Sequence, residues 1–291
     1  MTQEMEAVEG GVQDTVREAY RDFIEREQRF QALRQEPVLV TRLLFGIILV
    51  LFVGAFLFDA AFITERYGIN LGRGGLSIGT FFTGMKLPDR VYEGQWWRLI
   101  SSMFVHLGVM HIAFNGYGLY SIGPMVEQFY GRSRFVVIYL GSGVLSSLAS
   151  LLFTANASGG ASGALYGVVG AMIVFGAKYR ADLPARVSKA LTRSMLPWVI
   201  FGIGIGFVQG VNFDNAAHLG GLISGALLAL AMRSRITQTA ERRVGDYVVG
   251  ALAVALVTVT VVALGFWGQE AAQCLPSRDA YVACYPEVLA P

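Results

Sequence analysis

Charged side chains are scarce in this 291-residue chain: Asp, Glu, Lys and Arg make up 15% of the residues, whereas apolar residues make up 54%. The mean hydropathy is +0.51. Because soluble globular domains carry about 25% charged residues, this composition excludes an ordinary soluble enzyme. The net charge is only +2, and nothing in the sequence resembles a nucleic-acid-binding module. The sequence therefore predicts a protein that folds in a lipid bilayer.

Seven apolar segments approach the length of about 20 residues that a helix needs to cross a bilayer. We therefore expect an all-α polytopic membrane protein. The fourth, fifth and sixth segments are short, so each is expected to stand upright or to begin below the membrane surface. The segments are Leu43–Ile63, Met103–Val126, Phe135–Phe153, Gly160–Ala177, Met195–Val211, Ala216–Met232 and Val248–Trp267.

Lys and Arg are absent from the links "TANAS" (154–158) and "QGVNFDN" (209–215) but frequent in the links that alternate with them. Since cytoplasmic loops carry the excess of Lys and Arg, we expect the N-terminus in the cytoplasm, the C-terminus outside it, and the chain in the cell membrane. Loop 64–102 has five basic residues yet is placed outside. We interpret it as a folded element that is less subject to the rule.

The two ends of the chain carry no recognisable chemistry. The first 36 residues contain nine acidic and five basic residues, so no cleavable signal peptide is expected. The spacing of Val12, Val16, Tyr20 and Phe23 predicts an amphipathic helix outside the membrane, more typical of a solvated segment than of a partner-binding one. The two cysteines, Cys274 and Cys284, lie in the predicted outer tail, where either a local disulfide or two free thiols fit.

Polar side chains inside membrane spans are expensive and often functional. In this chain they include all three histidines. Spans two, four and six run from outside to inside in the predicted topology, and each has its polar residues in its early part. We therefore expect these side chains at one depth, near the outer leaflet. They are His106, His111 and Asn115 in span two, Ser162 and Tyr166 in span four, and His218 in span six.

Glycine spacing predicts that spans four and six approach closely. Gly163 and Gly167 are four residues apart, as are Gly221 and Gly225. Small residues at this spacing allow helix backbones to come together in membranes. The same helix period places His111 beside Asn115, and Ser162 beside Tyr166. The facing pattern therefore predicts that Ser162 and His218 meet, although helix packing without chemistry also explains any one glycine pair.

A serine becomes a nucleophile when a base removes its proton, and imidazole is the usual base. Ser162 and His218 supply such a pair. No Asp or Glu lies at their depth, and Asp214 is expected to serve the loop, so a Ser-His-Asp triad is not indicated. Tyr166 is a candidate to hold the imidazole by stacking. Asn115, His111 and the backbone N–H at the start of span four are candidate donors to a developing oxyanion.

These residues resemble the rhomboid family of intramembrane serine proteases. The matching motifs are "GASG" at 160–163, "HLGVMHIAFN" at 106–115, "AHLGGLISG" at 217–225, "WWR" at 96–98 and "GPMVEQFYG" at 123–131. The resemblance implies a six-helix core plus a seventh C-terminal span. It also implies a catalytic dyad of Ser162 and His218, with His111 and Asn115 lining the oxyanion hole. Supporting roles follow for Tyr166 and His106, and structural roles for Trp97, Arg98 and Glu127.

The resemblance also implies how the chain is organised into segments. We expect a cytoplasmic segment at 1–42, the protease core at 43–232 with its outer loop at 64–102, a linker and seventh span at 233–267, and an outer tail at 268–291. No cofactor or metal is expected; the partners would be transmembrane protein substrates and the bilayer. Two alternatives are a catalytically silent rhomboid-like binder or chaperone, and a transporter. A transporter would need a polar path through both leaflets, which is not visible.

Overall fold

The structure, a computed structural model, describes residues 2–58, 78–207 and 213–237. Within these ranges the regular secondary structure is helical, apart from a single antiparallel bridge between Lys86 and Ser158. The longer helices are α1 (Thr2–Arg34), α2 (Leu39–Phe58), α7 (Val109–Tyr130), α8 (Arg132–Phe153), α9 (Ser162–Lys178), α10 (Ala185–Arg193), α11 (Leu196–Ile205) and α12 (Asn215–Ala231). Short helices are α4 (Ile78–Phe82), α5 (Pro88–Tyr92), α6 (Arg98–Ser101), η2 (Ser102–Phe104) and η3 (Arg235–Thr237).

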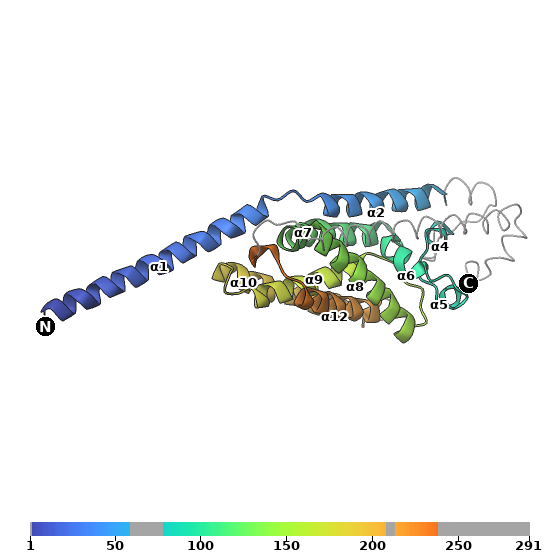
Figure 1. The fold of residues 1–291 in the computed structure, drawn as a ribbon. Helices are drawn as coiled ribbons and strands as arrows, with labels where there is room; N and C mark the ends of the chain where they lie inside the picture. Colours follow the sequence, from blue (N-terminus) through green and yellow to red (C-terminus); the bar gives the residue numbers. More distant parts are fainter. Residues whose placement is uncertain (1, 59–77, 208–212, 238–291) are drawn as a thin grey trace, which may run out of the picture.

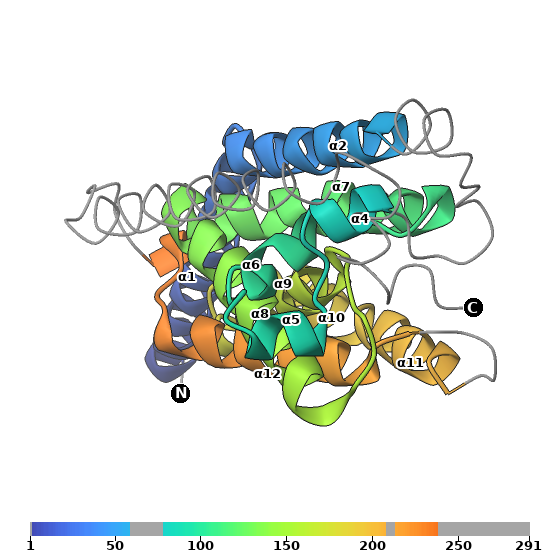
Figure 2. The same ribbon diagram turned by 90° about the vertical axis from the view of Figure 1, so that its right-hand side faces the viewer.

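The core of the bundle lies among α7, α8, α9 and α12, with α2 packed along α7. Figure 1 shows α1 and α10 at one end of the bundle, and α4 and α5 at the other. Aromatic rings fill the core at the α1 end, where Phe129 stacks on Phe175 with centroids 4.5 Å apart. Figure 2 shows α11 at the edge of the bundle, where Val199 is its one buried residue.

Glycines bring α9 and α12 into backbone contact. A Cβ atom at Gly221 would overlap the carbonyl group of Gly163, and one at Gly225 would overlap that of Gly167. On the other side of α9, Gly163 and Gly167 face the hydroxyls of Ser146 and Ser142 on α8. The predicted facing of the two glycine pairs is therefore confirmed. Helix α9 is held between α8 and α12 with no room for side chains at these positions.

The chain is a multi-pass membrane protein with several apolar helices. Among the described residues, three helices are long and apolar enough to span a bilayer, lying in Val12–Phe58, Arg132–Phe153 and Asn215–Thr237. A fourth is counted if Arg98–Phe104 and Val109–Tyr130, which are bent by 89°, form one span. Helix α9 is apolar but shorter, and α11 covers 10 residues. The predicted seventh span, Val248–Trp267, and the proposed Cys274–Cys284 disulfide lie outside the described residues.

The predicted start of span two was wrong. We expected a continuous helix from Met103, but Met103 lies in η2 and α7 begins at Val109. Between them the chain is extended at Val105 and at Gly108 (φ 166°, ψ 169°). His106 therefore lies in the turn before α7 and not within the span. The apolar run 103–105 belongs to the folded outer loop, so hydrophobicity alone set the boundary too early.

A buried guanidinium holds the described part of the outer loop together. Arg98 is 0% exposed. Its Nη1 donates to the carbonyl oxygens of Phe81 and Met85, both at 3.0 Å, and its Nε donates to Gln95 Oε1 at 2.6 Å. The guanidinium also lies 4.6 Å from the Phe81 ring centroid and 4.8 Å from that of Trp97. These contacts connect α6 to α4 and to the turn that follows α4.

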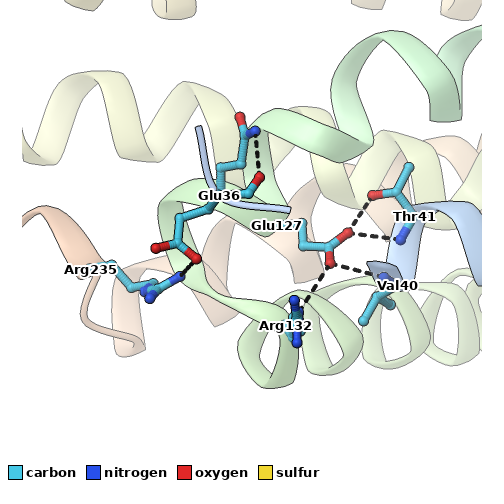
Figure 3. Close-up of polar contacts among 7 residues, drawn as sticks. Glu36, Val40, Thr41, Glu127, Arg132 and Arg235 are labelled. Atoms are coloured by element: carbon cyan, nitrogen blue, oxygen red, sulfur yellow. Dashed lines mark hydrogen bonds and ion pairs between the residues drawn. The ribbon is translucent and has the colours of Figure 1, made fainter. Parts of the chain in front are cut away.

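At the α1 end, Glu127 joins α7 to the start of α2 (Figure 3). One oxygen of this buried carboxylate accepts the Thr41 N–H (2.8 Å) and the Thr41 hydroxyl (2.7 Å), and the other accepts the Val40 N–H (2.9 Å). The first N–H groups of a helix have no partner within the helix. Glu127 therefore caps α2, and a negative charge suits this end of a helix. Arg132 lies 4.0 Å from Glu127.

The predicted N-terminal helix is confirmed as α1. Its spaced apolar residues Val12, Val16, Tyr20 and Phe23 are all exposed. Contact with the bundle is confined to its last turns, where Phe30 packs against Phe129 with ring centroids 5.8 Å apart. Most of α1 thus projects away from the bundle (Figure 1).

We predict that Gly221→Ala lowers the thermal unfolding temperature (Tm) of the detergent-solubilised protein, because its new methyl group overlaps the Gly163 carbonyl. Overpacking of this kind costs about 1–3 kcal/mol. Gly46→Ala on α2 is the matched control, since a Cβ there meets nothing within 4 Å. It should leave the Tm unchanged or raise it slightly, because Ala favours helix over Gly. Equal Tm values for the two variants would contradict the packing.

Candidate active site

Ser162 and His218 meet at the end of the bundle opposite α1. Ser162 is the first residue of α9, and His218 lies in the first turn of α12. The His218 Nε2 atom is 2.9 Å from Ser162 Oγ. The imidazole is buried, with 3% of its residue surface exposed. The two side chains therefore form a part-buried hydrogen bond, an arrangement that lets the imidazole accept the serine proton.

Aromatic rings fix the plane of the His218 imidazole. Tyr166, one turn after Ser162 on α9, stacks on it with centroids 4.3 Å apart and an interplanar angle of 11°. Phe213 meets the ring edge-on, with centroids 5.9 Å apart. The Tyr166 hydroxyl lies against Gly202 of α11, where a Cβ would collide with it. Stacking on the α9 side thus orients the imidazole toward Ser162.

The only carboxylate near the pair along the chain is engaged elsewhere. Asp214 is the N-cap of α12, and its Oδ1 accepts the Ala217 N–H at 3.0 Å. Within the described part of the chain, His218 Nδ1 has no hydrogen-bond partner. The geometry is therefore that of a dyad without an orienting carboxylate. Among the described residues, no cluster of three His, Cys, Asp or Glu side chains is placed to hold a metal ion.

His111 presents one ring nitrogen to the space beside Ser162. Its Nδ1 accepts the Leu107 N–H at 3.4 Å. In a neutral imidazole the other nitrogen then carries the proton. A Cβ built on Gly160 would lie 2.6 Å from His111 Nε2 and 3.7 Å from Ser162 Oγ. The absence of a side chain at Gly160 therefore leaves a small space between the nucleophile candidate and an N–H donor.

Asn115 lies one turn after His111 on the same face of α7. Its side-chain amide donates one hydrogen bond to the His111 carbonyl at 2.8 Å, which leaves its second N–H available. Asn115 is buried, and its Oδ1 has no partner among the described residues. The second N–H of Asn115 is therefore a candidate donor to a developing negative charge.

His106 holds the segment before Ser162 and does not touch the Ser162–His218 pair. Its Nε2 lies 3.4 Å from the Ala161 N–H, and its Nδ1 lies 3.3 Å from the Phe104 carbonyl. Its ring also tilts against that of His111, with centroids 5.1 Å apart. His106 therefore connects the turn before α7 to the turn before α9.

Two polar residues near the site were not singled out from the sequence. Lys86 of the outer loop and Ser150 of α8 are fully buried and bonded to each other. A signal for α8 exists in the sequence, because Ser142, Ser146 and Ser150 recur every four residues on one helix face. Lys86 carries no such signal, because it stands alone in a loop.

Comparison with known proteins identifies the family of this chain. The Rhomboid domain matches residues 93–235. The Bacillus subtilis (strain 168) protein YdcA is 30% identical over 155 residues, which cover 53% of this chain and 73% of YdcA. The chain belongs to the rhomboid family. The matched region contains Ser162, His218 and both donor candidates.

Other rhomboid relatives are longer than the region they share with this chain. "Rhomboid protease GluP" of Bacillus subtilis (strain 168) is 34% identical over 178 residues, which cover 61% of this chain and 34% of that protein. "RHOMBOID-like protein 9, chloroplastic" of Arabidopsis thaliana is 30% identical over 173 residues, covering 60% and 38%. This rhomboid chain thus spans little more than a third of the length of either protein.

We predict that Gly160→Ala slows modification of Ser162 by a fluorophosphonate, a reagent that bonds to activated serines. The new methyl group enters the space between His111 Nε2 and Ser162 Oγ, and misplacing an active-site group costs up to about 10²-fold in rate. The measurement is the rate of adduct formation by intact-protein mass spectrometry.

Gly94→Ala is the matched control for backbone strain. Gly94 also has a positive φ (104°, against 133° at Gly160), but a Cβ there meets nothing within 4 Å. It should react at the wild-type rate. Equal slowing in both variants would show that strain, and not the space beside Ser162, sets the rate.

Proposed function

We propose that this rhomboid is an intramembrane serine endopeptidase that cleaves single-pass membrane proteins near the outer end of their transmembrane segment. The observation that carries the proposal is the 2.9 Å contact between the buried His218 Nε2 and the half-buried Ser162 Oγ in a helical bundle. The name of GluP, a rhomboid protease, and the family membership support the same activity.

In the first half of the proposed reaction, Ser162 Oγ bonds to the carbonyl carbon of the scissile peptide while His218 Nε2 takes the hydroxyl proton. The carbonyl oxygen becomes an oxyanion. When the carbon–nitrogen bond breaks, the imidazolium gives its proton to the departing amine. The product is an ester between Ser162 and the N-terminal part of the substrate. Tyr166 keeps the imidazole in plane for both proton transfers, because its ring is stacked on it.

In the second half, His218 Nε2 accepts a proton from water as the water oxygen attacks the ester carbon. Collapse of this intermediate breaks the bond to Oγ, and the imidazolium returns the proton to Ser162. Both intermediates carry an oxyanion. We assign its stabilisation to His111 Nε2–H, the free Asn115 N–H and the N–H groups of the first turn of α9, which have no acceptor within the helix.

The proposed depth of the cut follows from the length of α9. Its 17 residues span about 26 Å at 1.5 Å per residue, less than the hydrocarbon core of about 30 Å. Lys178 ends the helix, and its ammonium donates to the Leu230 and Met232 carbonyls at the end of α12. With the basic links in the cytoplasm, Ser162 then lies a few ångströms below the outer surface. The N-terminus is cytoplasmic in this orientation.

Ser162→Ala and His218→Ala should each abolish cleavage of a single-pass substrate in reconstituted vesicles, by about 10⁴-fold or more. The double variant should lose no more than either single variant, because a serine without its base is already unreactive. Product formation is measured by gel analysis and mass spectrometry.

Ser224→Ala is the control for this experiment. Ser224 is also a buried serine of the α9–α12 pair, but among the described residues its hydroxyl bonds to the Gly220 and Gly221 carbonyls of its own helix, so activity should persist. Cleavage that survives in Ser162→Ala would reject the mechanism. A folded wild-type protein that binds but never cleaves membrane substrates would favour a silent binder.

The cut should fall at the outer end of the substrate span. A helical peptide bond is shielded by its own hydrogen bonds, so the substrate must unwind locally before Ser162 reaches it. We predict efficient cleavage when an Ala-Gly segment sits near the outer end of a poly-Leu span, and a progressive loss as the segment moves inward. Products are mapped by mass spectrometry. Equal cleavage at the bilayer centre would contradict both the depth and the proposed orientation.

A further inference from the structure

A fully buried lysine lies near the candidate site without taking part in it. Lys86, in the turn between α4 and α5, is 0% exposed. Its Nζ donates to Ser150 Oγ on α8 at 2.7 Å. Burial lowers the pKa of Lys86, and the charge of Asp214 opposes that shift. Since lysines are almost never fully buried unless paired, this residue must have a compensating interaction.

The compensating negative charge is that of Asp214, which is connected to Lys86 through the hydroxyl of Ser150. The Ser150 hydroxyl accepts from Lys86 and donates to Asp214 Oδ2. The other carboxylate oxygen of Asp214 accepts the Ala217 N–H at 3.0 Å, and its backbone carbonyl accepts the His218 N–H at 3.0 Å. Asp214 therefore fixes the first turn of α12, and that turn carries the imidazole.

The backbone of Lys86 is tied to the other half of the dyad. Its N–H donates to the Ser158 carbonyl at 2.8 Å, and its carbonyl accepts the Ser158 N–H at 2.9 Å. Ser158 lies four residues before Ser162, and the intervening Gly160 is anchored by its N–H to the Ser102 carbonyl at 2.9 Å. One residue thus holds the serine-bearing segment through its backbone and the histidine-bearing helix through its side chain.

We propose that Lys86, Ser150 and Asp214 form a positioning network that sets the distance between Ser162 and His218. The proposal rests on the proposed function, since it concerns the same dyad. Among the described residues, none of the three forms a hydrogen bond with Ser162 Oγ or the imidazole, so we assign them a positioning role through the segments that they hold. The hydrogen-bonded chain runs from the outer loop through α8 to α12, so it connects the segment before Ser162 with the first turn of α12.

The test compares Lys86→Met, Ser150→Ala, Asp214→Asn and the double variant Lys86→Met/Asp214→Asn in reconstituted vesicles. Asp214→Asn keeps a good N-cap residue but removes the charge. Each single variant should lower kcat about 10- to 100-fold, as expected for a misplaced catalytic group, with KM little changed. The double variant should be no slower than the slower single one, because removing both partners leaves no uncompensated buried charge.

Thr41→Val is the control for general destabilisation. It removes the hydroxyl that bonds to Glu127 at the opposite end of the bundle, so it should lower the Tm while leaving kcat at the wild-type value when assayed well below its Tm. Wild-type kcat in the Lys86 and Asp214 variants, or losses that multiply in the double variant, would overturn the network while the proposed function stands.

The Tm values of the same variants test, independently of activity, whether Lys86 and Asp214 are coupled. If the network exists, the Tm losses of Lys86→Met and Asp214→Asn are not additive in the double variant, since the residues interact through one hydroxyl. Additive losses overturn it. A wild-type protein that neither cleaves substrate nor reacts with a fluorophosphonate would reject the proposed function, and the Tm comparison would still decide whether Lys86 and Asp214 are coupled.

Discussion

The backbone contact between α9 and α12 is the constraint on which the rest of the structure depends. Ser162 and His218 are 56 residues apart in the chain, and their side chains are short, so a hydrogen bond between them requires the two helices to touch. Gly163 and Gly221 permit this contact one residue after the serine and three residues after the histidine. In a bilayer, where no hydrophobic force drives helices together, such close packing is a main source of association.

Among the described residues, the buried charged side chains Lys86, Arg98 and Glu127 lie toward the two ends of the bundle, where they connect separate elements. At the α1 end Glu127 caps α2 with both carboxylate oxygens. At the other end Lys86, Ser150 and Asp214 form a buried chain beside the dyad. An unpaired polar group is costly in apolar surroundings, so each such group specifies its partner. The positions of the helices thus depend both on close packing between α9 and α12 and on the hydrogen bonds at the two ends of the bundle.

The sequence predicted the features that depend on helix period and residue type. The glycine spacing predicted the contact between α9 and α12. The shared depth of the polar residues predicted that Ser162 and His218 meet. The bend before α7 was missed because Met103 and its neighbours are as apolar as a membrane span. The connection between Lys86 and Asp214 was not predicted, because the two residues lie 128 residues apart and are joined through Ser150 of α8. Backbone carbonyl acceptors, such as those of Phe81 and Met85 that bond to Arg98, cannot be identified from residue type.

The central claim is that the His218 imidazole activates Ser162. The most direct measurement is peptide mapping by mass spectrometry of the wild-type and His218→Ala proteins after exposure to a fluorophosphonate in lipid vesicles. We expect one adduct in the wild-type protein, on Ser162, and none in His218→Ala. An adduct on a different serine, or equal modification of Ser162 without the imidazole, would contradict the claim.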